Sequence, residues 1–178
     1  MTVCRNKGFH NATMRDIATA SRMSLGSLYD YIEKKEDVLF LIHKEVLDQI
    51  YSRMEDIIGG LKDPLAQLEK VFDELFALTV NLREEMLLIY TETKSLPKEY
   101  LHVILERESE FVAKYTALIE RGVQQGVFKC ENPDLLANIM VFVGSIIPLR
   151  GWNILSRYSA DDVCKMLKDM LFKYLDVS

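Results

Sequence analysis

The residues with the clearest chemical pattern run from Ser24 to Tyr29 and place small and polar side chains at the start of a short helix. Groups at the N-terminal end of such a helix can contact base edges in the major groove of DNA. Gly26 removes bulk there, Ser27 and Leu25 would face the bases, and Tyr29 can give its hydroxyl to a phosphate. The pattern therefore indicates a helix that reads DNA.

Two short helices separated by a tight break would position these residues. Apolar residues recur at helical spacing on both sides of the segment 21–24, namely Ile17, Ala18 and Ala20 before it and Leu28, Tyr31 and Ile32 after it. Thr13 can cap the first helix in a box with Asp16, and Ser24 can cap the second. This layout is a helix-turn-helix.

Other residues of the segment complete the set of candidate DNA contacts. Lys35 begins the next helix, where its ammonium and the free backbone amides can meet a phosphate. The candidate DNA-binding residues are Thr13, Met14, Arg15, Arg22, Ser24, Leu25, Gly26, Ser27, Tyr29, Tyr31 and Lys35. We expect a double-stranded DNA operator as the partner.

Residues 8–39 resemble the head of the TetR family of bacterial repressors. The matching residues are Gly8, Phe9, Thr13, Ile17, Ala18, Ser24, Gly26, Leu28, Tyr29, Tyr31, Lys35, Glu36 and Leu39. The resemblance covers residues 1 to about 50, and the rest of the chain matches in length and helical character. It implies a homodimeric transcriptional regulator, most simply a repressor, that leaves a palindromic operator when a small molecule occupies the helical body.

Three departures from the family pattern matter. Residues 21–23 read Ser-Arg-Met where the family has Ala-Gly-Val. Arg22 must therefore accept an uncommon backbone conformation or reshape the turn, and its charge can reach a phosphate. Leu25 stands where a polar or basic residue is usual, which predicts an apolar contact such as one with a thymine methyl. The family's full helix before Gly8 is reduced to residues 1–7, so we expect either that the natural protein begins upstream or that the head is malformed.

The charges are distributed unevenly along the chain. The 178 residues carry a net charge of −5. Residues 1–35 hold six basic and three acidic residues, a net charge of +3, while the remainder holds 16 basic and 24 acidic residues, a net charge of −8. A basic head on an acidic body directs the head toward phosphate. Taken alone, the charges also fit a chance fluctuation.

The spacing of apolar residues predicts an all-α fold. Hydrophobic residues make up 49% of the chain, and 8 Gly and 4 Pro interrupt a three- and four-residue apolar repeat. We expect helices over 36–58, 65–82, 84–95, 98–125, 133–155 and 160–177. They form a DNA-binding head, 1–50, and a ligand-binding and dimerisation body, 51–178. The charge-free stretch 135–149 is shorter than the ~20 residues of a membrane span and predicts a buried helix.

No pattern in the chain points to catalysis, a metal or a cofactor. The cysteines are dispersed and odd in number, at Cys4, Cys130 and Cys164, and the histidines are scattered at His10, His43 and His102. The cysteines are typical of reduced thiols in a cytoplasmic protein. Catalytic groupings and phosphate-binding loops are also lacking, so an enzyme is the weaker hypothesis.

The last two predicted helices are the expected homodimer surface. One face of the final helix is apolar and consists of Val163, Met166, Leu167, Met170, Leu171, Tyr174 and Leu175. Residues 139–149 are apolar nearly all round. Two helices from each subunit would bury this surface in a symmetric four-helix seam. The alternative is that both faces serve only the core of one subunit.

A polar interruption marks the expected effector site. Glu108 breaks the apolar stripe of the helix over 98–125, and a carboxylate on a buried face needs a partner. An ion pair with Arg150, or an interface contact, is the alternative to pocket lining. The candidate ligand-binding residues are Tyr90, Lys94, Glu108, Phe111, Arg150 and Trp152.

Two short segments bear on the identity of the effector. Residues 107–111 and 151–153 are similar to segments of family members that sense acyl-coenzyme A esters in fatty-acid or steroid breakdown. The resemblance implies a largely apolar effector that displaces the foot of the helix over 36–58. The runner-up hypothesis is a helical ligand-binding or interaction module that has lost DNA binding together with its first helix.

Overall fold

The computed structural model describes residues 8–175 and is helical throughout, with no strand within that range. The helices are α2 (Met14–Ala20), α3 (Leu25–Tyr29), α4 (Lys35–Gly60), α5 (Pro64–Asn81), α6 (Arg83–Glu92), α7 (Lys98–Gln124), α8 (Pro133–Gly144), α9 (Ile146–Ile154) and α10 (Ala160–Tyr174), with a 3₁₀ turn η1 (Thr93–Ser95) after α6. The predicted all-α fold is confirmed. The expected remnant of a first helix, 1–7, lies outside the described residues.

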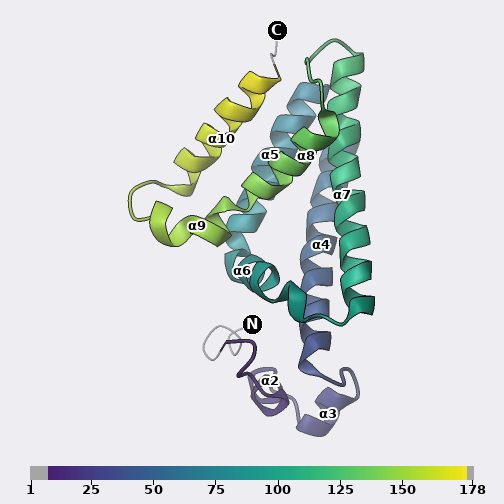
Figure 1. Ribbon diagram of the computed structural model, residues 1–178, viewed down its shortest axis with the longest axis vertical. Coiled ribbons are helices and arrows are strands. Elements are labelled where there is room, and N and C mark those ends of the chain that lie inside the picture. Colours follow the sequence, from purple (N-terminus) through teal and green to yellow (C-terminus); the bar gives the residue numbers. More distant parts are fainter. Residues whose placement is uncertain (1–7, 176–178) are drawn as a thin grey trace.

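Figure 1 shows how α4 joins the two parts of the molecule. Helices α2 and α3 lie at one end of α4, and α5 and α7 run beside the rest of it. Helix α8 packs on α5 and α7, and α10 lies along the outer side of α5. Helix α4 is continuous through residue 50, where the sequence predicted the boundary between head and body. One rigid element therefore connects the two.

Short-range signals fix where the body helices begin. The Asp63 side chain accepts a hydrogen bond from the amide of Ala66 at 2.9 Å, and Pro64 occupies the first turn, where it has no helical donor to lose. Ser159 and Asp162 form a full capping box at the start of α10. Both starts lie within a residue of the predicted ones.

The main core is an apolar cluster shared by α4, α5, α7, α8 and α10. It centres on buried side chains such as Met54, Leu68, Ile119 and Met140. A Cβ atom added at Gly122 would lie 1.9 Å from the ring of Phe128, so the chain after α7 can fold back onto the helix only at this glycine. The core also includes Met86 and Ile89 of α6 and Ile147 of α9, so it packs all the body helices together.

The predicted helix over 133–155 is wrong in one respect, because α8 and α9 meet at a 47° bend. Pro148 has no amide hydrogen and so cannot donate to the carbonyl of Gly144 four residues earlier. The buried hydroxyl of Thr79, on α5, donates to that carbonyl at 2.7 Å instead. No single described helix is long and apolar enough to cross a membrane. Helices α8 and α9 reach the length and apolar composition of a span only when the bent pair is taken together.

Helix α10 divides its apolar residues between two surfaces. Leu167, Leu171 and Leu175 are buried in the main core, whereas Met166 and Met170 are each 64% exposed. The single apolar face predicted for this helix is therefore two faces, one of which serves the subunit's own core. The exposed one remains available to a partner.

Candidate DNA-reading head and effector cavity

The turn between α2 and α3 is a Schellman motif in which Arg22 takes the place of the usual glycine. The amide of Met23 donates to the carbonyl of Ala18 at 2.9 Å, and the amide of Arg22 donates to Thr19 at 3.2 Å. Arg22 has φ = 57°, the left-handed conformation that a glycine adopts without strain. Of the two alternatives that the sequence left open, the uncommon backbone conformation is the one observed.

The caps predicted for the two head helices are confirmed. Thr13 and Asp16 form the capping box of α2, with each side chain bonded to the other residue's amide. The hydroxyl of Ser24 accepts from the amide of Ser27 at 3.0 Å and lies 2.9 Å from the hydroxyl of Ser27. Packing of Leu28 beneath α3 then directs the opposite side of this short helix outward.

The exposed end of α3 carries most of the expected base-reading residues. Gly26 and Ser27 are exposed and Tyr29 is 50% exposed, while Leu25 is half-buried against the small head core. Leu25 therefore shares its side chain between that core and solvent. The first turn of α3 is therefore exposed to solvent on the side away from the head core.

The other candidate DNA contacts surround this turn. Thr13, Arg15, Arg22 and Tyr31 are exposed, and Met14 is half-buried against the head core. Lys35 differs from the expectation, because its ammonium donates to the carbonyls of Phe9 and His10 at 3.3 and 2.7 Å. In this arrangement its charge ties the turn before α2 to the start of α4.

A second small core joins the head to the body. Phe9 and Ala12 of the head pack with Leu39 of α4, Leu96 and Ile104. Outside this core, His10 lies 3.0 Å from the carboxylate of Glu92, at the end of α6. The head therefore contacts α4, α6 and α7 together.

Asp37 is the polar centre of this junction. Its carboxylate accepts the amides of Glu33 and Lys34 at 2.8 and 3.0 Å and the hydroxyl of Tyr100 at 2.9 Å. Burial opposes ionisation, but these hydrogen bonds outweigh it and lower the pKa of Asp37. The ring of Tyr100 also stacks on Phe40, with centroids 4.4 Å apart. The start of α4 is thus held against α7.

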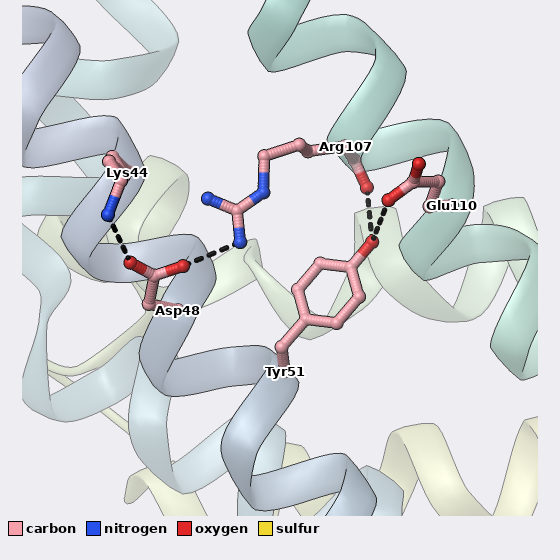
Figure 2. A network of polar contacts seen from close by, with 5 residues as sticks. All are labelled: Lys44, Asp48, Tyr51, Arg107 and Glu110. Atoms are coloured by element: carbon pink, nitrogen blue, oxygen red, sulfur yellow. Dashed lines mark hydrogen bonds and ion pairs between the residues drawn. The ribbon is translucent and has the colours of Figure 1, made fainter.

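Further along α4, a polar network fastens its middle to α7 (Figure 2). Arg107 donates to Asp48 at 2.5 Å, and the hydroxyl of Tyr51 donates to the carbonyl of Arg107 at 2.7 Å. The guanidinium of Arg107 and the ammonium of Lys44 hold the pKa of Asp48 below its usual value. Burial and the nearby Glu110 carboxylate raise the pKa of Tyr51 to about 12. Helix α4 is therefore bonded to α7 both near its start and in its middle.

A cavity of about 380 Å³ lies between the body helices. Four elements each contribute a stripe spaced i, i+3, i+4 and i+7: His43, Val46, Leu47 and Ile50; Phe72, Leu75, Phe76 and Thr79; Glu108, Phe111, Val112 and Tyr115; and Asn138, Val141, Phe142 and Ser145. Its size and its mainly apolar wall are typical of small-molecule sites. One of its walls is α4, the helix that carries the head.

Two of the groups on this wall are perturbed by burial. His43 is 1% exposed and its Nε2 lies 3.0 Å from the hydroxyl of Thr93, and burial lowers its pKa to about 4. Glu108 lines the cavity while remaining accessible to solvent, and desolvation raises its pKa. The histidine is neutral at neutral pH, and the carboxylate is the acidic group of the wall.

The candidate ligand-binding residues separate into two groups. Tyr90, Glu108 and Phe111 line the cavity, whereas Lys94, Arg150 and Trp152 do not. The alternative ion pair between Glu108 and Arg150 is not formed. Arg150 instead lies 5.4 Å from the ring centroid of Trp152, which is 77% exposed. Both residues lie on α9, which meets α8 at a 47° bend and contributes no residue to the cavity lining, and sequence spacing alone could not anticipate this bend.

His43, Thr79 and Asn138 also line the cavity, although they were not among the predicted ligand-binding residues. Each interrupts an apolar helical stripe with a polar group, which is the same signal that singled out Glu108. Applied to every helix, that signal would have identified a common polar lining.

The described residues hold no group arranged as a metal site, and one of their two free thiols has a raised pKa. No group of three or more His, Cys, Asp or Glu among residues 8–175 is placed to hold a metal ion. Cys130 and Cys164 are free, and burial and the nearby Asp73 raise the pKa of Cys164 to about 11.

The outer surfaces of α8 and α10 carry exposed apolar side chains. Leu135 and Phe142 on α8 are 59% and 60% exposed. With Ile139 on the same helix and Met166, Met170 and Tyr174 on α10, they form what we call the α8–α10 face. Exposed apolar side chains that gather on one surface are a common feature of interaction sites.

Both parts of the chain are similar to known families of proteins. Residues 2–42 match the model of the bacterial regulatory proteins of the tetR family, and residues 61–175 match that of the tetracyclin repressor-like C-terminal domain. The chain is 27% identical over 157 residues to the HTH-type transcriptional regulator HbdR of Aromatoleum sp. (strain CIB), a match that covers 86% of this chain and 67% of HbdR. It is 25% identical over 130 residues to the HTH-type transcriptional repressor KstR2 of Mycobacterium tuberculosis (strain H37Rv), covering 72% of this chain and 64% of KstR2. The matched stretch thus spans about two thirds of each curated relative.

A solved structure resembles the whole arrangement. AibR in complex with isovaleryl coenzyme A and operator DNA superposes with a TM-score of 0.80 at 20% identity, covering 99% of this chain and 94% of AibR. This likeness concerns the fold. The two family-model matches, over residues 2–42 and 61–175, leave only short segments of the chain uncovered. They show that the chain belongs to the TetR family of bacterial transcriptional regulators.

Proposed function

We propose that the protein is a homodimeric, cytoplasmic repressor that leaves a palindromic operator when a largely apolar effector enters the cavity. One observation carries this proposal. Helix α4 lines the cavity with His43 and Ile50 and, one turn before His43, packs Leu39 against Phe9 of the head. A ligand that shifts α4 therefore shifts the head. It favours release only if it binds the released state more tightly.

The exposed first turn of α3 supports operator binding. Two such turns, one from each subunit, must sit about 34 to 36 Å apart to enter successive major grooves. The α8–α10 face supplies the apolar surface that would hold the subunits at such a spacing. Apart from Met14, Leu25 and Lys35, which are half-buried, every candidate DNA contact is exposed.

An acyl-coenzyme A ester is the effector class that the relatives favour. AibR was solved with isovaleryl coenzyme A, and KstR2 is described as a ketosteroid transcriptional regulator. The mainly apolar cavity can accept an acyl chain or a steroid-like ring system.

Operator release is tested with a DNA fragment from the region upstream of the protein's own gene. Fluorescence anisotropy should give an affinity that falls steeply with rising salt, as expected when phosphates are neutralised. Saturating isovaleryl- or longer acyl-coenzyme A should weaken it about tenfold or more. A bound effector that leaves operator affinity unchanged would contradict the switch, and absence of DNA binding would favour the module without a functional head.

The dimer is tested separately by light scattering. The double variant Ile139→Asp, Met170→Asp places two charges on the α8–α10 face, at positions outside the cavity lining, and should give monomers that bind the operator weakly. The control Val103→Asp, Leu105→Asp introduces the same two charges at exposed apolar positions of α7 and should remain dimeric. Monomeric wild-type protein at micromolar concentration would contradict the proposal.

A further inference from the structure

The charged groups on the cavity wall restrict the ligands that it can accept. None of the described lining residues is Lys or Arg, and Glu108 is the carboxylate among them. A ligand carboxylate or phosphate brought to this wall would lose its hydration without meeting a cation, and it would face a like charge. The wall therefore disfavours anions.

Several donors on the wall are already engaged. The Thr79 hydroxyl is used by backbone carbonyls, and the Thr93 hydroxyl donates to the carbonyl of Ile89 at 2.5 Å. His43 Nε2 then donates to the Thr93 oxygen at 3.0 Å. The amide nitrogen of Asn138 donates to a carbonyl of its own helix at 2.9 Å. These groups are therefore engaged, and the other side-chain donors of the wall are the neutral hydroxyls of Tyr90, Tyr115 and Ser145.

Glu108, in contrast to these donors, is a hydrogen-bond acceptor that is not engaged by the described residues. It lies on the same stripe of α7 as Phe111 and Tyr115, and it has no hydrogen-bond or ion-pair partner among the described residues. Desolvation raises its pKa, so the ionised carboxylate is less stable here than in water. A donor supplied by a ligand would compensate this cost.

We propose that the group of the effector that meets the cavity wall donates a hydrogen bond to Glu108, as a hydroxyl, an amine or an amide N–H does. A free carboxylate is rejected. An acyl-coenzyme A ester can place its acyl chain and an amide N–H of its linker in the cavity, while its phosphates stay outside. This inference rests on the proposed effector cavity and adds the chemical class of its polar contact.

Three ten-carbon probes that differ only in the polar end test it: decylamine, decanol and decanoate. Isothermal titration calorimetry on the full chain at neutral pH should show decanoate binding at least about tenfold more weakly than decylamine. Glu108→Gln should reduce decylamine affinity about tenfold and bring the three probes closer together. The matched control Glu106→Gln, on the exposed side of the same helix and paired with His102, should change nothing.

The outcomes separate this inference from the proposed function. Decanoate binding as tightly as decylamine, with Glu108→Gln without effect, would overturn the role of Glu108 but leave the cavity intact. The variant Val112→Phe fills the cavity from α7 and should weaken all three probes. Failure of every probe to bind, or equal binding to Val112→Phe, would contradict the cavity itself.

Discussion

The small core of the head contains the buried side chains Ile17, Ala18, Leu28 and Ile32, all within sixteen residues of one another in sequence. The main body core instead joins residues as distant as Val46 and Leu175. In the head, helix caps and a Schellman turn, all formed between residues close in sequence, position the exposed first turn of α3. In the body, the cavity exists only because four distant helices meet. A substitution in the head should therefore act locally, whereas one in the cavity should act on the whole fold.

The largest effect is expected at His43, because its burial makes the stability of the body depend on pH. Its pKa is about 4 in the folded protein against 6.5 for an ordinary histidine, so the unfolded chain binds the extra proton first as pH falls. The contribution of neutral His43 to the free energy of unfolding is fully present above pH 6.5. It is lost progressively toward pH 4, by roughly 3 kcal/mol. His43→Gln should remove this slope in urea unfolding measured between pH 4.5 and 7.5.

The control for this prediction is His102→Gln, an exposed position on α7. It should keep the wild-type slope. Equal pH dependence of wild type and His43→Gln would mean that the buried histidine does not couple the body to protonation.

A smaller effect, confined to DNA binding, is expected at Tyr29. Tyr29→Phe removes a hydroxyl from the exposed side of α3 and should lower operator affinity about tenfold, since a hydrogen bond to a phosphate is worth roughly 1.5 kcal/mol. Anisotropy titration measures the loss, and the melting temperature should not change. Tyr158→Phe, exposed on the loop before α10, is the control. A similar loss in the control would show that the effect is not specific to the head.

The smallest effect is expected at Arg22, where the backbone is strained. Arg22→Gly should stabilise the turn by about 1 kcal/mol, because a non-glycine residue in the left-handed region costs roughly that much. Hydrogen exchange of the α2 and α3 amides should slow while the body is unaffected. Arg22→Lys keeps the charge and the strain, so it should exchange as the wild type does. Slower exchange throughout the body would show that the head is not an independent unit.

The comparison also explains which features could be predicted from the sequence. The caps at Thr13 and Ser24 and the unusual conformation of Arg22 follow from residues within four positions, so spacing sufficed to anticipate them. Lys35 could not be placed, because the carbonyls that it meets belong to Phe9 and His10, more than twenty residues away.

The cavity shows the same limit more strongly. Glu108 was identified from one helical stripe, but the identity of its neighbours depends on how α4, α5 and α8 pack against α7. Arg150 was misplaced because the bend after Gly144 arises from two separate causes, the missing donor of Pro148 and the hydroxyl supplied by Thr79. Neither cause alone is visible as a break in apolar periodicity.

The carboxylate of Asp37 has a consequence for engineering hybrid regulators. One of its oxygens accepts the amides of Glu33 and Lys34, in the segment between α3 and α4. The other accepts the hydroxyl of Tyr100, from a helix that begins more than sixty residues later. A chimera that transplants only the N-terminal third of this chain onto a foreign sensor would leave that oxygen without its phenol and Phe40 without its stacking partner. Successful grafts should carry Leu96, Tyr100 and Ile104 along with the transplanted segment.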